Sequence, residues 1–468
     1  MKLPLIGRPR VGLLPMYIAL YDRAAPENRA VIGRRLDEVC KTLEAAGLSV
    51  VCADICAAKP EFERAMSALE KANLDLLVTL HLAYSPSGES AAQLARSPLP
   101  ILMLDTTPQY DFGPRTDPKG IMQNHGIHGL QDLASVLRRM GRRCAVEAGH
   151  LKHSDVVKRV ARWARAGQAA RRLRTARVGR VGKAFKSMDD FAVAEDVLRS
   201  KLGPVVKSIS PAALAKWAPS AASKEVLLEL ALDRKRFDAS KVDPAAHADS
   251  VRAGLALRHF VGKERLSAVT MNFESFTSES GMPTVPFLEA GKAMARGIGY
   301  AGENDVLTAA LVGAFLGPYR DVTFAEMFCP DWKGGTVFLS HMGEMNLNVA
   351  ARKPLLVAPP YPWSKITPPV IAACAPKPGP AVFANIAPGP ADTFTLILAP
   401  VEVLEEPKNS RYREKIRGWI RPRLRLERFL EEYSRHGGTH HAMLVFGDRL
   451  DDLEKFAFLA GLPTAVIG

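Results

Sequence analysis

The sequence contains few cysteines, and their spacing excludes two common classes of protein. The 468-residue chain has six, at positions 40, 52, 56, 144, 329 and 374. They form neither the CxxC pairs of a structural zinc site nor the dense pattern of a disulfide-rich secreted domain. We therefore predict reduced, mostly buried thiols. Cys52 and Cys56 are the closest pair, and their strand-like surroundings favour a structural role over a redox role.

Long apolar runs are also absent. No stretch of about 18 uninterrupted apolar residues occurs, as a transmembrane helix would require. Residues 1–12 include basic side chains but lead into a strand-like run, without the apolar core and small-residue cleavage site of a secretory signal. We therefore expect a cytoplasmic protein with no membrane partner.

Glycine-rich phosphate-binding motifs are missing as well. No GxGxxG follows the first predicted strand, and no GxxxxGK[ST] occurs anywhere in the chain. These absences argue against dinucleotide binding. The sequence also has no GxSxG elbow and no cysteine placed beside a histidine as a nucleophile. These absences argue against hydrolases with a serine or cysteine nucleophile.

Acidic residues are outnumbered by basic ones, and the formal net charge is +14. Much of the excess lies in residues 158–186, where a nucleic-acid-binding helix would have a similar composition. However, Val157, Val160, Ala161 and Ala164 follow helical spacing, and ARVGRVG resembles a strand. No zinc finger, RNP aromatic motif or GXXG loop accompanies the basic residues. We therefore expect a solvated face, or attraction of anionic substrates, and no nucleic-acid partner.

The length and the order of predicted elements indicate an α/β protein of several domains. In the first third, strands predicted near residues 11–20, 48–55, 74–82 and 100–106 alternate with helices near residues 27–46, 61–72 and 89–95. This order predicts a doubly wound parallel sheet, whose ligands collect at the carboxyl ends of the strands. Those ends carry Tyr17, His81, Tyr84 and Thr106.

The rest of the chain predicts a second α/β region and then a β-rich region. From Ala145 onward, a helix, the ARVGRVG strand, further helices and LSAVTMNF repeat the α/β texture. Beyond Phe324, short strands broken by proline and glycine indicate an antiparallel sheet or barrel. We predict an N-terminal α/β domain (1–144), a central α/β domain (145–300) and a barrel-like C-terminal domain (301–468).

Four acidic or imidazole features in the last third could carry chemistry. They are Glu303 in AGENDV, Glu326 in TFAEMF, His341 in LSHMGE and the doublet His440–His441 in GGTHHAM. Each has an ordinary alternative: a first-turn acid complementing a helix dipole, a surface acid, or a core histidine. Together, two carboxylates and two imidazoles suit Mn²⁺, Co²⁺ or Fe²⁺ better than a closed structural zinc site.

Several blocks resemble those of L-arabinose isomerases, in the same order and at similar spacing. They are GYAGENDVLTAALV, TFAEMF, FLSHMGEMN, PGPAVFANI and GGTHHAMLVFGD. The basic middle run RVARWARAGQAARRLRTARVGRVGKAFKSMDDFAV also resembles the corresponding family segment, whereas HGIHGLQDLASVLRRMGR is closer to the sister L-fucose isomerases.

This resemblance implies a metal-dependent aldose–ketose isomerase. The family's two glutamate and two histidine ligands fall on Glu303, Glu326, His341 and His441, and the glutamates are assigned the proton transfers. Its sugar-contacting positions correspond to His128, Met188 and Tyr84. The resemblance also implies a homo-oligomer, a trimer or hexamer, with Mn²⁺ as the expected metal.

The chain departs from the family in its sugar pocket. The usual N-terminal Gly-Ser-Gln-His signature is replaced by LPMYIALYD, which places Tyr17 or Tyr21 where a glutamine would meet the sugar. We therefore expect a pentose or 6-deoxyhexose substrate other than L-arabinose, isomerised through an enediolate. Two alternatives remain: an epimerase or lyase on the same fold, and a non-catalytic sugar-binding homologue.

Overall fold

The structure is a computed structural model that describes residues 7–468. Residues 1–6, which contribute to the argument against a secretory signal, lie outside the described part. The described chain forms two compact units, an N-terminal unit ending at Ala170 and a C-terminal unit, Arg171–Gly468. No helix in residues 7–468 is both long and apolar enough to cross a membrane. The predicted three-domain division at 144/145 and 300/301 stays a prediction.

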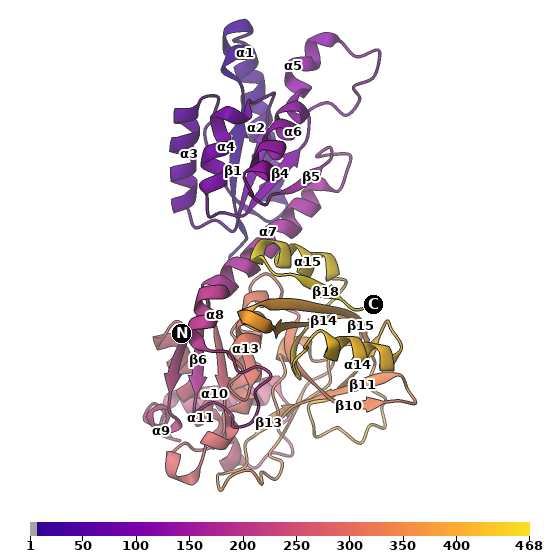
Figure 1. Ribbon diagram of the computed structural model, residues 1–468. Helices are drawn as coiled ribbons and strands as arrows, with labels where there is room; N and C mark the ends of the chain where they lie inside the picture. Colours follow the sequence, from indigo (N-terminus) through magenta and orange to yellow (C-terminus); the bar gives the residue numbers. More distant parts are fainter. Residues whose placement is uncertain (1–6) are drawn as a thin grey trace. The chain divides into compact units, whose positions relative to one another are not determined.

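The N-terminal unit contains a five-stranded, fully parallel sheet in the order β2-β1-β3-β4-β5 (Figure 1). Its strands are β1 (Arg10–Met16), β2 (Ser49–Cys52), β3 (Leu76–His81), β4 (Ile101–Asp105) and β5 (Ala145–Ala148). Its helices are α1 (Ala19–Ala24), α2 (Asn28–Ala45), α3 (Lys59–Lys71), α4 (Ser87–Arg96), α5 (Ile121–Asn124) and α6 (Gly126–Arg139). The strand order reverses between β1 and β3, so a crevice is expected at their carboxyl ends.

Apolar spacing explains how these helices form and pack. In α2, Ile32, Leu36, Val39 and Leu43 recur every three to four residues and are buried. The helix stops before Gly47, whose φ of +89° is a left-handed conformation that glycine adopts without strain. Helices α3, α4 and α6 contribute to one apolar cluster with β1, β3 and β4, which confirms the predicted parallel α/β sheet.

The first predicted strand is shorter in the structure than its apolar run. We expect residues 11–20 to be extended, but β1 ends at Met16 and α1 begins at Ala19. The backbone N–H of Tyr17 donates to the carbonyl of Cys56, and the chain then turns into α1. All six cysteines are free thiols, but only Cys56 and Cys374 are buried, so the expectation of mostly buried thiols is met only in part.

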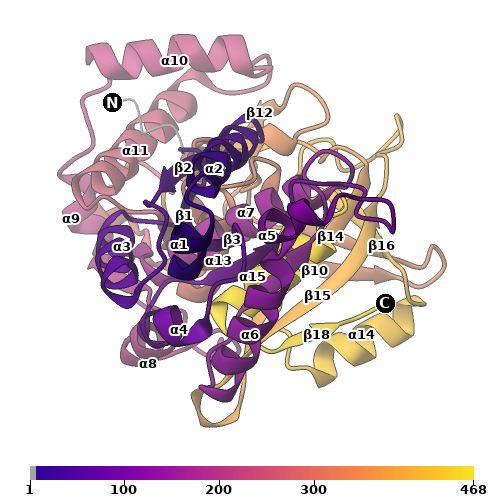
Figure 2. The ribbon, with the colours of Figure 1, turned by 90° about the horizontal axis from the view of Figure 1, so that it is seen from above.

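The C-terminal unit begins in α7 (Val156–Arg174), which starts in the N-terminal unit, and contains a second parallel sheet in the order β7-β6-β8-β9. Its strands are β6 (Arg177–Val181), β7 (Val205–Ile209), β8 (Ala268–Met271) and β9 (Gly299–Gly302). The accompanying helices are α8 (Glu195–Lys201), α9 (Pro211–Ala215), α10 (Lys224–Arg236), α11 (Pro244–Lys263), α12 (Phe287–Ala295) and α13 (Val306–Phe315). Figure 2 shows α10 and α11 side by side, as their contacts require.

The last part of the chain closes into a six-stranded barrel. The order is β14-β17-β10-β11-β16-β15, and β15 pairs back with β14; β18 extends β15 in parallel. The strands are β10 (Val322–Asp331), β11 (Thr336–Ser340), β14 (Gly379–Pro388), β15 (Phe394–Val403), β16 (Gly418–Pro422), β17 (His441–Phe446) and β18 (Thr464–Val466), with helices α14 (Leu426–Arg435) and α15 (Leu450–Ala460). The predicted β-rich region is therefore confirmed as a barrel. One short strand beyond Phe324 lies outside the barrel: β12 (Leu355–Val357) pairs with β13 (Ile371–Ala373) and forms an isolated bridge with Asp238.

A buried ionic cluster joins α10, α11 and α12. The Lys292 ammonium lies 2.9 Å from Glu229 and 2.5 Å from Asp233, and all three side chains are nearly inaccessible. Arg258 bridges Glu229 and Glu289. Burial raises the pKa of Glu229, but hydrogen bonds from Arg258 and the charge of Lys292 outweigh it and hold that pKa well below its ordinary value.

We expect Lys292→Met to destabilise the C-terminal unit by about 3–5 kcal/mol, because it leaves buried carboxylates without their cation. Equilibrium urea unfolding measures the change as a lower transition midpoint. Lys224→Met removes the same charge at the exposed start of α10 and is the matched control. Equal midpoints for the two variants would contradict the assigned role of Lys292.

Candidate metal centre

Glu303 lies in a strained turn between β9 and α13. Its φ is +59° and that of Asn304 is +68°, a left-handed conformation that is uncommon for residues other than glycine. Asp305 then caps α13 by accepting a hydrogen bond from the Thr308 N–H at 2.8 Å. Glu303 thus precedes the helix and is not part of its first turn, so the helix-dipole alternative does not apply. Such strain is concentrated at functional sites.

The register of the barrel brings three further predicted residues together. Glu326 on β10 is paired with Ser340 on β11 and with His441 on β17. Residues paired in this way on antiparallel strands have Cβ atoms roughly 4.5–5.5 Å apart. His341 follows Ser340 directly, at the end of β11, so the two ladders bring the backbone of both histidines close to Glu326.

The side chains of these residues converge. The Glu303 Oε2 atom lies 3.4 Å from His441 Nε2, and Glu326 Oε2 lies 3.5 Å from His341 Nε2. Candidate ligand atoms of Glu303, His341 and His441 all lie within 4.8 Å of one another. The same holds for Glu326, His440 and His441, so two overlapping triads share His441.

Carboxylates outside this group orient both imidazoles. Glu344 Oε2 lies 2.7 Å from His341 Nδ1, and its other oxygen accepts a hydrogen bond from the Tyr300 hydroxyl at 2.5 Å. Asp305 Oδ2 lies 3.2 Å from His441 Nδ1. Carboxylates that hold Nδ1–H in this way leave the Nε2 lone pair for a metal. His441 Nε2 is buried and lies 3.4 Å from the Glu303 carboxylate, so it points toward the other candidate ligands, as a cation ligand would.

Aromatic rings enclose the two histidines. Phe324 packs edge-on against both rings, with centroids 4.9 Å from His341 and 5.0 Å from His441. Phe191 stacks on His441 at 5.0 Å and 11°. Gly302 leaves room for the His341 ring, because a Cβ there would lie 2.6 Å from Cε1 and 2.7 Å from Nε2.

We therefore expect Gly302→Ala to lower the affinity for a divalent ion by about 10–100-fold, as displacement of a ligand's support does in other metal sites. Metal titration of the purified protein measures it. Gly33→Ala, in the open middle of α2 where an added Cβ meets nothing within 4 Å, is the control. Unchanged affinity in Gly302→Ala would show that the His341 ring is not a ligand in this position.

The electrostatics of the cluster favour bound positive charge. Burial lowers the pKa of His341, but the adjacent Glu344 and the two glutamates outweigh it and raise the pKa to about 9. Burial raises the pKa of Glu303, yet hydrogen bonds from His440 and His441 bring it below its ordinary value. Burial raises the pKa of Glu326 despite the neighbouring imidazoles. A buried group of carboxylates and imidazoles without a thiolate suits a cation such as Mn²⁺.

A pocket of about 280 Å³ adjoins this cluster. Glu303 and Asn304 form part of its wall, and Met188, one of the predicted sugar-contacting residues, lines it together with Phe185 and Phe191. A ligand in this pocket would therefore lie next to Glu303, at one edge of the cluster of candidate metal ligands.

Sequence reasoning missed the residues that support the ligands. Glu344 and Asp305 lie within three residues of His341 and Glu303, so acids next to each motif could have indicated them. Asp190 is not next to a recognised motif residue of this kind, and its sequence gave no such signal. Its Oδ2 atom lies 2.7 Å from His440 Nδ1, and His440 Nε2 on the other side of the ring lies 3.6 Å from Glu303 Oε2.

The remaining predicted sugar contacts belong to the N-terminal unit, near the carboxyl ends of β1 and β3. Tyr84 stacks on His128 at 4.4 Å, and His128 Nδ1 lies 2.9 Å from His125 Nε2. Tyr17 is buried, and its ring meets the edge of Tyr21 at 6.1 Å. The sugar-binding roles of His128, Tyr84 and Tyr17 stay predictions.

The fold and the cluster define a class of protein: parallel α/β sheets followed by a closed barrel that carries a carboxylate–imidazole site. Models of the L-arabinose isomerase central domain and C-terminal domain match residues 203–316 and 321–463. The chain belongs to the L-arabinose isomerase-like family.

Curated relatives support this membership across most of the chain. An L-arabinose isomerase of Shouchella clausii is 25% identical over 352 residues, covering 74% of this chain and 71% of that protein. An L-arabinose isomerase of Herpetosiphon aurantiacus is 27% identical over 354 residues, covering 72% and 69%. Both matches cover more than two thirds of this chain and more than two thirds of the relative.

Proposed function

We propose that this chain is a metal-dependent aldose–ketose isomerase that acts on a pentose or a 6-deoxyhexose through an enediolate. The observation that carries the proposal is a pair of overlapping triads, Glu303–His341–His441 and Glu326–His440–His441, which share His441 and lie close enough for Glu326 Oε2 to be 3.5 Å from His341 Nε2. The family match and the adjacent 280 Å³ pocket support it.

These four side chains would hold one divalent ion, for which Mn²⁺ is the expected choice and Co²⁺ or Fe²⁺ the alternatives. When bound, such an ion acts as a Lewis acid toward a carbonyl and its neighbouring hydroxyl. The fixed Nδ1 contacts of His341 and His441 with Glu344 and Asp305 keep both Nε2 atoms available. The packed rings of Phe191 and Phe324 limit the access of water.

Glu303 and Glu326 are the proposed acid–base residues. One carboxylate removes the proton from C2 of the open-chain aldose, and the carboxylic acid formed by this step returns the proton to C1. The proton of the C2 hydroxyl passes to O1, which completes the conversion of the aldehyde into a ketone at C2. The roles exchange in the reverse direction. Contacts with His440 and His441 restrict the orientation of the Glu303 carboxylate. Backbone pairing with His441 fixes the position of the Glu326 Cα and Cβ atoms.

Two alternatives use the same site. An epimerase or lyase would also form an enediolate, and product analysis separates them because isomerisation gives a ketose of unchanged mass. A sugar-binding protein without activity would need no pair of carboxylates at this point, so the convergence of Glu303 and Glu326 favours catalysis. We further propose that the protein is a cytoplasmic homo-oligomer, a trimer or hexamer, that binds no nucleic acid.

We expect L-arabinose to be a poor substrate compared with another pentose or a 6-deoxyhexose. Tyr17 and Tyr21 replace the polar signature of the family, and a phenol ring does not offer the hydrogen bonds of a glutamine amide. A lost hydrogen bond to a substrate hydroxyl can change selectivity by orders of magnitude. Steady-state kinetics with added Mn²⁺ on a panel of pentoses, hexoses and 6-deoxyhexoses tests both activity and preference. The highest kcat/KM for L-arabinose would contradict the substrate argument, and no ketose from any sugar would contradict the isomerase proposal.

A further inference from the structure

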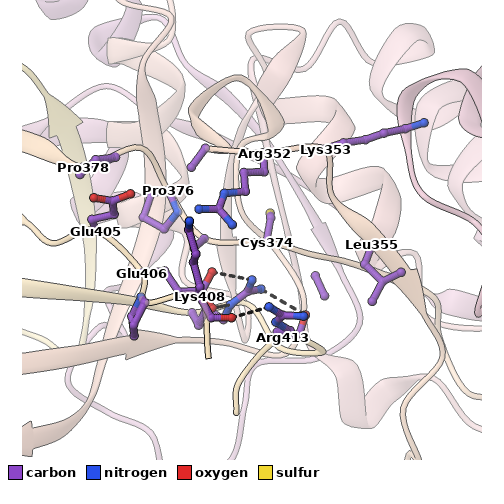
Figure 3. A pocket seen from close by; sticks show the side chains of 15 residues that line it. Arg352, Lys353, Leu355, Cys374, Pro376, Pro378, Glu405, Glu406, Lys408 and Arg413 are labelled. Atoms are coloured by element: carbon purple, nitrogen blue, oxygen red, sulfur yellow. Dashed lines mark hydrogen bonds and ion pairs between the residues drawn. The ribbon is translucent and has the colours of Figure 1, made fainter. Parts of the chain in front are cut away.

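A second pocket, of about 420 Å³, lies in the C-terminal unit and contains none of the candidate metal ligands (Figure 3). Three segments form its walls, at residues 351–355, 373–378 and 405–417. Its volume falls within the range of small-molecule sites in proteins. The proposed isomerase site does not account for it.

Positive charge predominates around this pocket. The lining includes two acidic residues, Glu405 and Glu406, against five basic residues, so the excess is three positive charges. The basic residues are Arg352, Lys353, Lys408, Arg413 and Arg417.

The deeper acid is already neutralised. Glu406 forms a two-pronged ion pair with Arg417, with distances of 2.5 Å to Nε and 2.8 Å to Nη2. Burial raises the pKa of Glu406, but hydrogen bonds from Arg417 and Ser410 outweigh it and keep the carboxyl ionised. Both oxygens of Glu406 are therefore engaged by Arg417, and a single negative charge is shared with the other basic side chains of the pocket.

Two basic side chains converge on the hollow without forming an ion pair among the described residues, although the charge of Arg352 also acts on the carboxyl of Glu406. Figure 3 shows Arg352 and Lys408 pointing into the pocket, and neither forms an ion pair within residues 7–468. Lys353 points away from them in the same view, and its charge acts on the carboxyl of Asp238. Like charges that face a common hollow repel each other, and an anion between them removes the repulsion.

We propose that this pocket binds a phosphorylated small molecule of about the size of a sugar phosphate. A guanidinium offers paired N–H donors that match phosphate oxygens, and an ammonium adds a mobile point charge. The pocket is larger than inorganic phosphate alone would fill, and Leu355, Ala373 and Pro376 supply apolar surface for the rest of the ligand.

Isothermal titration calorimetry of the full chain with inorganic phosphate and with a pentose 5-phosphate tests the proposal. We expect both to bind, the pentose phosphate more tightly, and Arg352→Gln or Lys408→Gln to raise its Kd by about tenfold or more. Lys353→Gln, the matched control, should change Kd by less than about twofold. His341→Ala should bind the pentose phosphate as the unchanged protein does, which separates this pocket from the proposed isomerase site.

Three results would overturn the proposal. The first is no heat of binding with either phosphate compound. The second is an equal loss of affinity in Lys353→Gln and Lys408→Gln, which would indicate nonspecific attraction to the basic surface. The third is equal binding of malonate, a dicarboxylate without phosphate geometry, which would assign the pocket to carboxylates. The isomerase proposal is unaffected by any of these outcomes.

Discussion

Replacing His341 with alanine should abolish both metal uptake and isomerase activity. The imidazole is buried, its Nδ1 lies against Glu344, and its Nε2 lies 3.5 Å from Glu326. Removing it takes away a ligand and leaves the buried carboxylates of Glu326 and Glu344 without their partner, so alanine supplies no substitute. We expect the divalent-ion content to fall from one per chain to near zero and kcat to fall by at least about 10³-fold.

Elemental analysis of the purified protein and a ketose assay measure the two effects. The matched control is His436→Ala, at the exposed end of α14, which should keep full metal content and turnover. Treating the unchanged protein with a chelator should reproduce the loss of activity, and added Mn²⁺ should restore it. Full metal occupancy and turnover in His341→Ala would remove this residue from the site.

Glu326→Gln should lower kcat by about 10²–10⁴-fold, the usual contribution of a positioned acid–base group. The substitution keeps the size of the side chain and its place opposite His441, but an amide cannot take or return the proton. In deuterated water, the unchanged protein should exchange the reacting C–H position of the sugar, and the variant should not.

Glu402→Gln provides the control for this substitution. Glu402 lies on β15 with its side chain exposed, so the same chemical change occurs in the barrel away from the cluster. Rapid deuterium exchange in Glu326→Gln would assign the proton transfer to another group.

Much of the fold was predictable because apolar periodicity reports burial directly. The alternation of strands and helices in residues 11–106 indicated a parallel sheet, and the short strands beyond Phe324 indicated the barrel. The prediction that failed, the length of the first strand, concerned a feature that tertiary contacts determine. Residues 18–20 are as apolar as the strand before them, but Leu20 is half exposed on α1 because the backbone turns after Tyr17 bonds to Cys56.

The candidate ligands and two of their supports, Glu344 and Asp305, could be found from the sequence, whereas another support could not. Glu303, Glu326, His341 and His441 occur in recognisable motifs, and the structure places them in two overlapping triads, one of which also contains His440; their role as ligands stays a prediction. Asp190 supports the cluster through a side chain that reaches His440 from a separate segment. Nothing in the local sequence around Asp190 distinguishes it from an ordinary surface acid.

The pairing of β10 with both β11 and β17 has a consequence for how the enzyme matures. A slip of one residue in either ladder would turn Glu326, or the segment that leads to His341, to the opposite face of the barrel. The candidate ligands can therefore come together only after these two ladders have formed in the correct register. If the proposed site holds an ion, we expect the ion to bind after these ladders have formed, and protein made without metal should already hold the four side chains in their final arrangement.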